Sequence, residues 1–358
     1  MQPTTASRGT VPAAIILVNW NSWRHCLECI DSLLAQDYPD FHVFLVDNDS
    51  RDGSVEQIAA WCGAPKADPQ WRRQDGVDRY TDLHPHTAID CRVVDRPQDA
   101  LPASPPGTRL TLIRAGGNLG FAGGCNVGIR AAGLEAFACF WLLNTDTVVH
   151  RHALRELVDR ATRDFQTGLV GSTIRFYDRP ETLQCLGGAR LHVKSMNSHL
   201  IGEGQPISAV PQNTASIEAE MAYVMGASML VTAAFVRKVG LLQEDYFLYY
   251  EEIDWALRGR EHFRIGYAAG SHVFHRSGAS SSRVLPAFSS NLYYRNRLRF
   301  VSRFFPDRLG AAKRGMAVDL LRHSLRGRWT HARILAAVLW DAPALTSQER
   351  PWSPQTPS

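Results

Sequence analysis

The sequence predicts an α/β fold in which a parallel, doubly wound sheet is flanked by helices. Two apolar runs, residues 13–18 and 41–46, have the length and composition of buried strands, and each is followed by a helical pattern. The order strand–helix–strand–helix at this spacing is typical of parallel sheets. Both runs end in clusters of Asn, Asp and Ser, at Asn19–Ser22 and Asp47–Ser50. The carboxyl ends of strands are where open α/β sheets place their ligands.

The remaining elements are marked off by Gly, Pro and helix-capping residues. Ser22 is the expected N-cap of a first helix, from Trp23 to about Gln36, and Asp52-Gly53-Ser54 turns into a second. Residues 184–211 carry too little pattern to be placed. Further strands are expected at residues 91–94, 110–113, 140–144, 169–176, 223–231, 265–269 and 272–276, and further helices from Val127 to about Leu134, from about His152 to Thr162 and from Thr232 to Val239.

Composition restricts the class of protein. At 358 residues the chain is expected to form one large or two modest domains, and its 45% hydrophobic and 21% charged residues are ordinary for a soluble globular protein. The net charge of +4 gives no reason to expect a nucleic-acid partner. No stretch reaches the ~18–20 apolar residues of a membrane span, and residues 1–10 lack a signal-peptide pattern. A cytoplasmic location is therefore expected.

Cysteine usage agrees with that location. The chain has seven cysteines, an odd number, which fits reduced thiols better than a disulfide framework. Cys26 and Cys29 have the spacing of a redox dithiol, but together with Leu27, Ile30 and Leu33 they also recur at helical spacing. We therefore expect a packed helix face rather than a redox or metal site.

The chain divides into a main domain over residues 11–285 and a helical C-terminal region over residues 286–342. Residues 62–108 are expected to be an insertion, since they exceed ordinary loop lengths, and residues 343–358 a disordered tail. Ser277 to Ser282 has the composition of a flexible lid or linker. The C-terminal region is basic between residues 295 and 333, where Asp307 and Asp319 are outnumbered by Arg295, Arg297, Arg299, Arg303, Arg308, Lys313, Arg314, Arg322, Arg326, Arg328 and Arg333.

Two segments carry candidate ligand-binding chemistry. The apolar run at residue 140 breaks into Asn144-Thr145-Asp146, which fits either an Asx turn or a metal ligand at a strand end. The glycine-rich segment 116–126 fits either a turn or a close approach of the backbone to a ligand. Its spacing matches neither the dinucleotide fingerprint nor the P-loop, which argues against a dinucleotide oxidoreductase and a P-loop phosphotransferase.

A third segment holds three acids behind an aromatic run. Glu251, Glu252 and Asp254 follow residues 246–250 and continue as a helix. Capping explains acids in a first helical turn, because the helix dipole favours carboxylates there by roughly 0.3–1 kcal/mol each. Crowding of three acids also raises at least one pKa, which suits a general base near neutral pH. His275, near the end of the last strand, fits a core or a functional histidine.

In number, order and spacing these blocks resemble the family 2 glycosyltransferases of the GT-A fold, especially their rhamnosyltransferase-like bacterial branch. The resemblance spans roughly residues 13–300 and rests on short motifs. They are Val18–Ser22, Val46–Ser54, Asn118–Asn126, Leu143–Asp146, Tyr249–Arg258, His275 and Tyr294-Arg295-Asn296. It implies a mixed, mainly parallel sheet flanked by helices, with a C-terminal helical extension.

The resemblance also implies an activity. It implies an inverting transfer of a sugar from a nucleotide-diphosphate donor, dTDP-rhamnose or a UDP-sugar, to a hydroxyl of a glycan or a lipid-linked saccharide in cell-surface polysaccharide assembly. Glu252 or Glu251 matches the base of the family, and Asp254 would orient the acceptor. Glu252 departs from the usual Asp, which leaves the choice of base open. The donor-binding positions implied are Asn19, Asn21, Asp47, Asp49, Asn118, Gly120, Phe121, Asn126, Asn144 and Arg295.

In the same way, the resemblance implies a divalent cation, Mg²⁺ or Mn²⁺, on Asp146 and His275. Asn144 stands where stricter members of the family have a first Asp, which weakens the metal prediction. The basic region with its tyrosines and phenylalanines fits peripheral contact with the inner face of the cytoplasmic membrane or with a polyprenyl-diphosphate-linked acceptor. A solvated face or a homo-oligomer interface fits it as well. Two other functions stay open, a catalytically silent sugar-nucleotide-binding protein and a nucleotidyltransferase.

Overall fold

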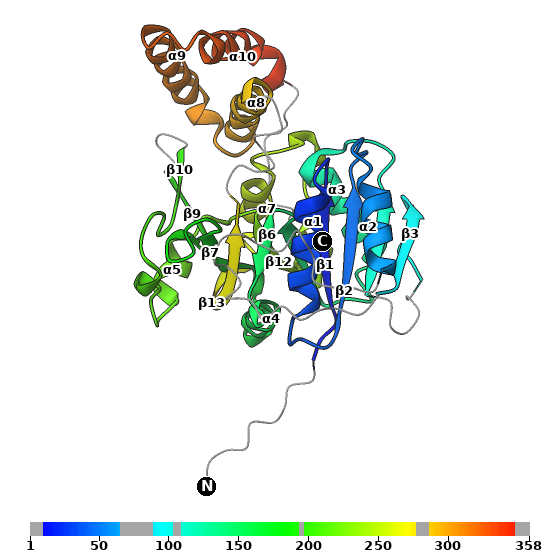
Figure 1. Ribbon diagram of the computed structural model, residues 1–358. Helices are drawn as coiled ribbons and strands as arrows, with labels where there is room; N and C mark the ends of the chain where they lie inside the picture. Colours follow the sequence, from blue (N-terminus) through cyan, green and yellow to red (C-terminus); the bar gives the residue numbers. More distant parts are fainter. Residues whose placement is uncertain (1–9, 65–88, 103–108, 193–196, 277–285, 348–358) are drawn as a thin grey trace.

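A computed structural model describes residues 10–64, 89–102, 109–192, 197–276 and 286–347 (Figure 1). Ten strands form one sheet in the order β3-β4-β2-β1-β5-β12-β7-β13-β6, with β8 paired to β7, and three short strands form a second sheet, β10-β9-β11. The strands are β1 (Ala13–Asn19), β2 (Phe41–Asp47), β3 (Cys91–Asp95), β4 (Leu110–Arg114), β5 (Cys139–Asn144), β6 (Thr147–Val149), β7 (Thr167–Phe176), β8 (Leu183–Leu186), β9 (Gly188–His192), β10 (Asn197–Leu200), β11 (Tyr223–Val224), β12 (Ser228–Thr232) and β13 (Arg264–His275).

Helices cover the main sheet on both faces, as the predicted class requires. The α-helices are α1 (Trp23–Leu34), α2 (Ser54–Gly63), α3 (Gly120–Ala132), α4 (Ala153–Arg163), α5 (Ala215–Glu220), α6 (Ala233–Val239), α7 (Glu251–Gly259), α8 (Pro286–Phe304), α9 (Leu309–Leu325) and α10 (Trp329–Ser347). Short 3₁₀ turns lie at η2 (Ile207–Ala209), η3 (Glu244–Tyr246) and η4 (Pro306–Arg308).

The first five strands of the sheet run parallel, and two of the remaining strands on the path, β12 and β6, run antiparallel to them. β3, β4, β2, β1 and β5 are parallel neighbours, whereas β12 is antiparallel to both β5 and β7. β13 runs parallel to β7, and β6 closes the edge in the antiparallel direction. The sheet is therefore mixed but mainly parallel, as the sequence predicts. The carboxyl ends of β1, β2, β5, β7 and β13 lie along one edge.

Alternate residues of each buried strand enter two separate cores. Ile15 and Leu17 of β1 pack with α1, α2 and α4 on one face, while Ala14 and Ile16 pack with α3 and α6 on the other. Period-two alternation on a strand buried on both faces gives this division. Cys26 and Cys29 are free and fully buried in the first core, which confirms the packed helix face.

The C-terminal helices α8, α9 and α10 form a unit at one end of the molecule (Figure 1). Its own core contains Leu298, Met316 and Leu335. A second cluster joins it to the main domain, with Phe300 of α8 packing with Ile253 and Leu257 of α7. In the described ranges, no helix has the length and apolarity that a bilayer span requires.

Three sequence expectations about elements are wrong, and the predicted N-cap of α1 is correct in position. Helix α3 begins at Gly120, seven residues before the expected start, because its glycines lie against the sheet instead of forming a turn. The expected strand 223–231 is two strands, β11 and β12, in different sheets. The expected strands 265–269 and 272–276 are one strand, β13, whose register shifts between Ala268 and His272. Ser22 stands at the N-cap of α1 but makes no side-chain capping bond.

The other boundaries agree with the sequence or extend it. Strand β3, expected within the insertion, pairs with β4 at the sheet edge. The unplaced segment after Gln184 contains β9 and β10. Helix α10 continues past the expected end of the C-terminal region at residue 342, to Ser347. The expected lid at 277–282 and the tail from residue 348 lie outside the described residues.

Candidate functional site

The ends of β1 and β2 hold a buried carboxylate in a fixed orientation. Asn19 and Asp47 are register partners, and the Asn19 amide donates to Asp47 Oδ1 at 2.9 Å. The Asp47 Oδ2 atom accepts from the Ser50 backbone N–H at 3.0 Å, and the hydroxyl of Ser50 accepts from the Asn21 N–H at 2.8 Å. Asn21 and Asp49 both have positive φ, and Asp49 is exposed. Four predicted donor-binding residues are thus brought together.

The glycine-rich segment forms the N-terminal turns of α3 beside this cluster. The Asn118 side chain accepts from the Gly120 N–H at 3.1 Å, and the Asn48 amide donates to the Gly120 carbonyl at 2.8 Å. Gly120 has φ of +70°, and a Cβ there would lie 2.2 Å from the Phe247 carbonyl oxygen. That carbonyl accepts from the Phe121 N–H at 2.7 Å. Gly120 therefore permits a close contact between α3 and the loop that leads to the acids.

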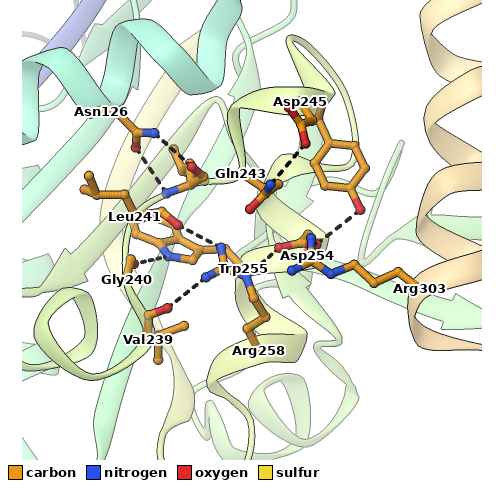
Figure 2. A network of polar contacts seen from close by, with 12 residues as sticks. Asn126, Val239, Gly240, Leu241, Gln243, Asp245, Asp254, Trp255, Arg258 and Arg303 are labelled. Carbon is orange, nitrogen blue, oxygen red and sulfur yellow. Dashed lines mark hydrogen bonds and ion pairs between the residues drawn. The ribbon is translucent and has the colours of Figure 1, made fainter. Parts of the chain in front are cut away.

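Asn126 lies further along the same helix, and its side chain hydrogen-bonds to other residues of the protein. Its amide donates to the Leu242 carbonyl at 2.8 Å, and its oxygen accepts from the Leu242 N–H at 3.1 Å (Figure 2). The same amide also donates to the Glu244 carboxylate at 2.9 Å. These contacts hold residues 242–244 against α3. Donor binding by Asn126 stays a prediction.

Asp146 and His275 meet at the carboxyl edge of the sheet. His275 pairs with Thr147 across β13 and β6, which brings its Nε2 to 3.3 Å from Asp146 Oδ1. Both side chains are buried. The Nδ1 atom of His275 lies 2.9 Å from the Gln184 side-chain oxygen, which can only accept. This contact places a ring proton on Nδ1, and Nε2 is the ring nitrogen that faces Asp146.

The Asp146 and His275 pair fits a divalent cation as a partial ligand set. A carboxylate oxygen and an imidazole nitrogen converge, and a second contact fixes the histidine tautomer, as is usual for metal-ligating histidines. Among the described residues no group of three or more His, Cys, Asp or Glu side chains is arranged to hold a metal ion. The protein thus offers two ligands at this point, which suits a cation that also binds substrate phosphates. Asn144 precedes them, with its N–H bonded to the Ala227 carbonyl at 3.1 Å.

Glu251 and Glu252 open helix α7 with perturbed acidity. Burial, and then the neighbouring Glu252, raise the pKa of Glu251 well above its usual range. Burial raises the pKa of Glu252 to about 7. Glu252 is the less buried of the two, and its Oε1 lies 3.3 Å from the Cβ position of Gly226, near the Phe121 ring. The pair thus includes a carboxyl group that titrates near neutral pH, as the crowding of acids predicts.

A short connection joins the carboxylate pair to the Asp146 strand end. Glu252 lies against Gly226, and the next residue, Ala227, accepts the bond from Asn144. Asn144 is two residues before Asp146. Asp146 and the pair formed by Glu251 and Glu252 therefore lie at the same edge of the sheet, although more than a hundred residues separate them in the chain.

The loop before α7 adopts a conformation that non-glycine residues rarely take. Phe247, Tyr249 and Tyr250 have φ of 61°, 71° and 76°. The Leu248 N–H donates to the Tyr246 carbonyl at 2.6 Å, across a tight three-residue turn. Each such backbone conformation costs about 1–3 kcal/mol and persists only where surrounding contacts impose it. Strain of this kind next to a carboxylate pair is typical of a functional site.

Asp254, the third acid, is the centre of a buried ion-pair network (Figure 2). Its Oδ1 accepts from Arg258 at 2.6 Å, and its Oδ2 is 3.1 Å from the Tyr246 hydroxyl and 3.2 Å from Arg303. Arg258 also donates to the carbonyls of Val239 and Leu241. Asp254 is fully buried, so its contacts fix α7 and the preceding loop. A direct role in catalysis stays a prediction.

Arg295 lies elsewhere, with its guanidinium 3.1 Å from Asp341 of α10, and donor binding by Arg295 stays a prediction. Sequence reasoning missed Gln184, which orients His275, and Asn296, which donates to three loop carbonyls. Gln184 stands in a stretch without a periodic pattern, so the sequence carried no signal for it. Asn296 stands in a motif of the resemblance, which marked its position but not its contacts.

Known proteins match the chain in part. Residues 14–72 match the family model described as glycosyl transferase family 2. The hexosyltransferase Agl10 of low-salt glycan biosynthesis in Haloferax volcanii is 26% identical over 187 residues, which are 52% of this chain and 58% of that protein. The chain therefore spans somewhat more than half the length of this curated relative.

The fold has solved counterparts. A crystal structure of GalNAc-T7 with UDP, GalNAc and Mn²⁺ superposes with a TM-score of 0.55 at 13% identity, covering 83% of this chain and 49% of that chain. A mannosyltransferase from Pyrobaculum calidifontis, solved with GDP-Man and Mn²⁺, has a TM-score of 0.49 at 14% identity, covering 95% of this chain and 88% of that chain. The likeness to GalNAc-T7 shows a shared fold, the GT-A glycosyltransferase fold. Together with the matches in sequence, it supports a family 2 glycosyltransferase.

Proposed function

We propose that the protein is an inverting glycosyltransferase that moves a sugar from a nucleotide-diphosphate donor to an acceptor hydroxyl. One observation carries the proposal: a pair formed by Asp146 and His275 and a carboxyl group of raised pKa on Glu252 face the same sheet edge. Asp146 and His275 suit a divalent cation that also binds the diphosphate of a donor, and Glu252 suits removal of a proton. A binding protein requires no such carboxyl group.

Glu252 is the proposed base. With a pKa of about 7, burial leaves it largely ionised at slightly alkaline pH and still basic enough to accept a proton. Its carboxylate takes the proton of the acceptor hydroxyl while that oxygen forms a bond to the anomeric carbon. The bond from the anomeric carbon to the diphosphate oxygen breaks on the opposite side, and nucleoside diphosphate leaves. Burial and the neighbouring Glu252 also raise the pKa of Glu251, which favours its protonated form.

Asp146 and His275 would hold Mg²⁺ or Mn²⁺, and a bound cation supplies positive charge that stabilises the departing diphosphate. Gln184 contacts Nδ1 of His275, so Nε2 is the ring nitrogen that would take that role. The crystal structure of GalNAc-T7 with UDP and Mn²⁺ supports this assignment by analogy of fold. Imidazole as a ligand favours Mn²⁺ over Mg²⁺.

The donor nucleotide is proposed to lie over the ends of β1 and β2, beside the first turns of α3. The polar groups there have their orientations fixed by bonds to one another. Hydroxyl and base-edge recognition needs such groups. A UDP-sugar or dTDP-rhamnose is the favoured donor, and the proposed contacts are Asn19, Asn21, Asp47, Asp49, Asn118, Gly120, Phe121 and Asn144.

The acceptor is proposed to be a glycan or polyprenyl-diphosphate-linked saccharide at the inner face of the cytoplasmic membrane. Agl10, a hexosyltransferase of glycan biosynthesis, supports a role in glycan assembly. Residues 286–342 contain eleven Arg and Lys against three Asp, and exposed Leu321, Leu325, Trp329 and Trp340 stand among them. Basic residues together with exposed apolar and aromatic residues favour an anionic bilayer. The same excess of charge opposes self-association through this region.

Release of nucleoside diphosphate from a panel of dTDP-, UDP- and GDP-sugars, with and without Mn²⁺, tests the proposal. Wild-type protein should release it from at least one donor, and Glu252→Gln and Asp146→Asn should lower the rate at least a hundredfold. A catalytically silent binder would be stabilised by a donor without releasing product. A nucleotidyltransferase would form diphosphate and a nucleotide-sugar instead. Either result would overturn the assignment.

Vesicle flotation tests the membrane contact separately. The protein should float with vesicles containing phosphatidylglycerol and stay in solution with phosphatidylcholine alone. Replacement of exposed Leu325 and Trp329 by Ser should abolish flotation, whereas Phe165→Ser, at an exposed site outside the C-terminal region, should not. Equal flotation on neutral vesicles, or none on either, would reject an electrostatic membrane surface.

A further inference from the structure

We propose that Asn296 of α8 is a positioning residue for the Glu251 and Glu252 pair, and that the C-terminal helical region is thereby a working part of the active site. The side chain of Asn296 holds residues 246–250 in the strained conformation from which the two glutamates project. The inference rests on the proposed function only in giving the glutamates a catalytic role. The contacts that carry it are independent of that role.

The contacts of Asn296 are concentrated on one loop. Its Nδ2 atom donates to the backbone carbonyls of Tyr246 at 2.7 Å, Leu248 at 2.8 Å and Tyr249 at 3.0 Å. The side chain is 1% exposed. An amide offers two N–H groups on one uncharged, planar nitrogen, so at least one of these hydrogens is shared between two carbonyls. No hydroxyl or carboxylate presents the same set of donors.

The loop needs such a partner because its backbone is irregular and largely shielded. Three of its residues have positive φ, so its carbonyls cannot continue a helix or a sheet ladder. Buried carbonyls without a partner are strongly unfavourable, and Asn296 supplies partners for three of them. Next along the chain are Glu251 and Glu252, the first residues of α7.

Asn296 belongs to a continuous face of α8 that contacts this region. Arg299, one turn further on, donates to the Asp245 carbonyl, and Arg303, another turn on, pairs with Asp254. Phe300 on the same side stacks against Tyr250, with 5.4 Å between ring centres. The spacing of 296, 299, 300 and 303 is that of one helix face. One helix thus holds the chain before, within and after the start of α7.

A shift of α8 would therefore move the glutamates relative to the Asp146 end of the site. Catalytic geometry is sensitive to such shifts, since a misplacement of about 1 Å can lower a rate about a hundredfold. The titratable groups that interact with the pair are Tyr223 of β11 and Cys125 of α3. The loop residue Tyr250, next to Glu251, faces Tyr293 and Arg297 of α8.

Three variants of the full-length protein test the inference. Asn296→Ala removes the donors and the bulk, and Asn296→Asp keeps the shape but directs carboxylate oxygens at carbonyls. Leu298→Ala removes bulk from the core that α8 shares with α9 and α10 and leaves the contacts of Asn296 in place. Hydrogen exchange at the amides of residues 247–254 is measured by mass spectrometry. Steady-state turnover of the donor found in the panel is measured across pH 5–9.

Both Asn296 variants should exchange the 247–254 amides at least tenfold faster than wild type, and Leu298→Ala should not. Their kcat should fall about a hundredfold, with a small change in KM for the donor. The acid limb of the pH profile of turnover should move below pH 7, because an opened loop exposes the glutamates to water. Leu298→Ala should keep the wild-type profile. Wild-type exchange in both Asn296 variants would overturn the positioning role, whatever the activity. Faster exchange in a protein that turns over no donor would instead overturn the proposed function.

Discussion

Replacement of Glu252 by Gln should abolish transfer and at the same time stabilise the protein above neutral pH. The amide cannot accept the acceptor proton, and it also removes a charge from a site that burial disfavours for charges. Active sites often hold groups in environments that lower the stability of the fold, so a variant that is inactive but more stable is the expected signature of a base.

The expected change in the free energy of unfolding follows from the pKa of Glu252, which burial raises from its ordinary 4.5 to about 7. Below pH 4.5 the group is protonated in both states and contributes no pH dependence. As the pH rises, the unfolded chain releases the proton first, so the native state loses stability until the pH passes about 7. The full difference corresponds to about 3 kcal/mol, and about 2.5 kcal/mol of it develops between pH 5 and pH 8.

Urea unfolding at pH 5 and pH 8 measures this difference. Relative to wild type, Glu252→Gln should gain about 2.5 kcal/mol in the free energy of unfolding between the two pH values. The matched control is Glu261→Gln, at an exposed position just beyond α7, whose difference from wild type should be the same at both. If Glu252→Gln gained no stability at pH 8, the burial argument would be refuted. If it kept wild-type turnover, the assignment of Glu252 as the base would be refuted.

Three further outcomes follow from the same geometry. Asp254→Asn should lower the free energy of unfolding by about 3–5 kcal/mol in urea melts, because it leaves buried guanidinium groups without their carboxylate. Gly120→Ala should destabilise the protein by clearly more than Gly116→Ala, since both have positive φ but only the first would drive a Cβ into the Phe247 carbonyl; equal losses would count against that contact. Thermal stabilisation by Mn²⁺ with UDP should disappear in Asp146→Asn, and its survival would place the metal elsewhere.

The sequence predicted the strands and the polar residues at their ends, because both depend on local pattern. A short run of consecutive residues is enough to show a buried strand rich in Val, Ile and Leu. The same run shows an acid at the point where the strand ends. For this reason the positions of Asp47 and Asp146 at one edge of the sheet could be predicted from the amino-acid sequence. Parallel pairing then brought together Asn19 and Asp47, as the class predicts.

Other features depend on contacts between distant segments, and no local pattern records these. The segment at Gly120 was expected to be a turn, yet glycines also serve where a helix lies close against a sheet, as Gly124 does against Val18. The antiparallel course of β12 between β5 and β7 depends on the whole chain. The partners of Asn126 and Asn296 are backbone groups more than forty residues away, so residue type alone could not reveal them.

The distribution of the site along the chain bears on where its specificity resides. The family match covers residues 14–72, which carry the ends of β1 and β2, whereas Asp146, His275 and the glutamate pair lie far beyond it. The first region would bind the nucleotide, a part that many donors share. The glutamate pair is positioned next to the Asp146 strand end by β12 and by the contact of Glu252 with Gly226. The loop before Glu251 is held by α8. Differences in acceptor specificity should therefore arise from the region between β12 and α8, which lies beyond the residues that the family model matches.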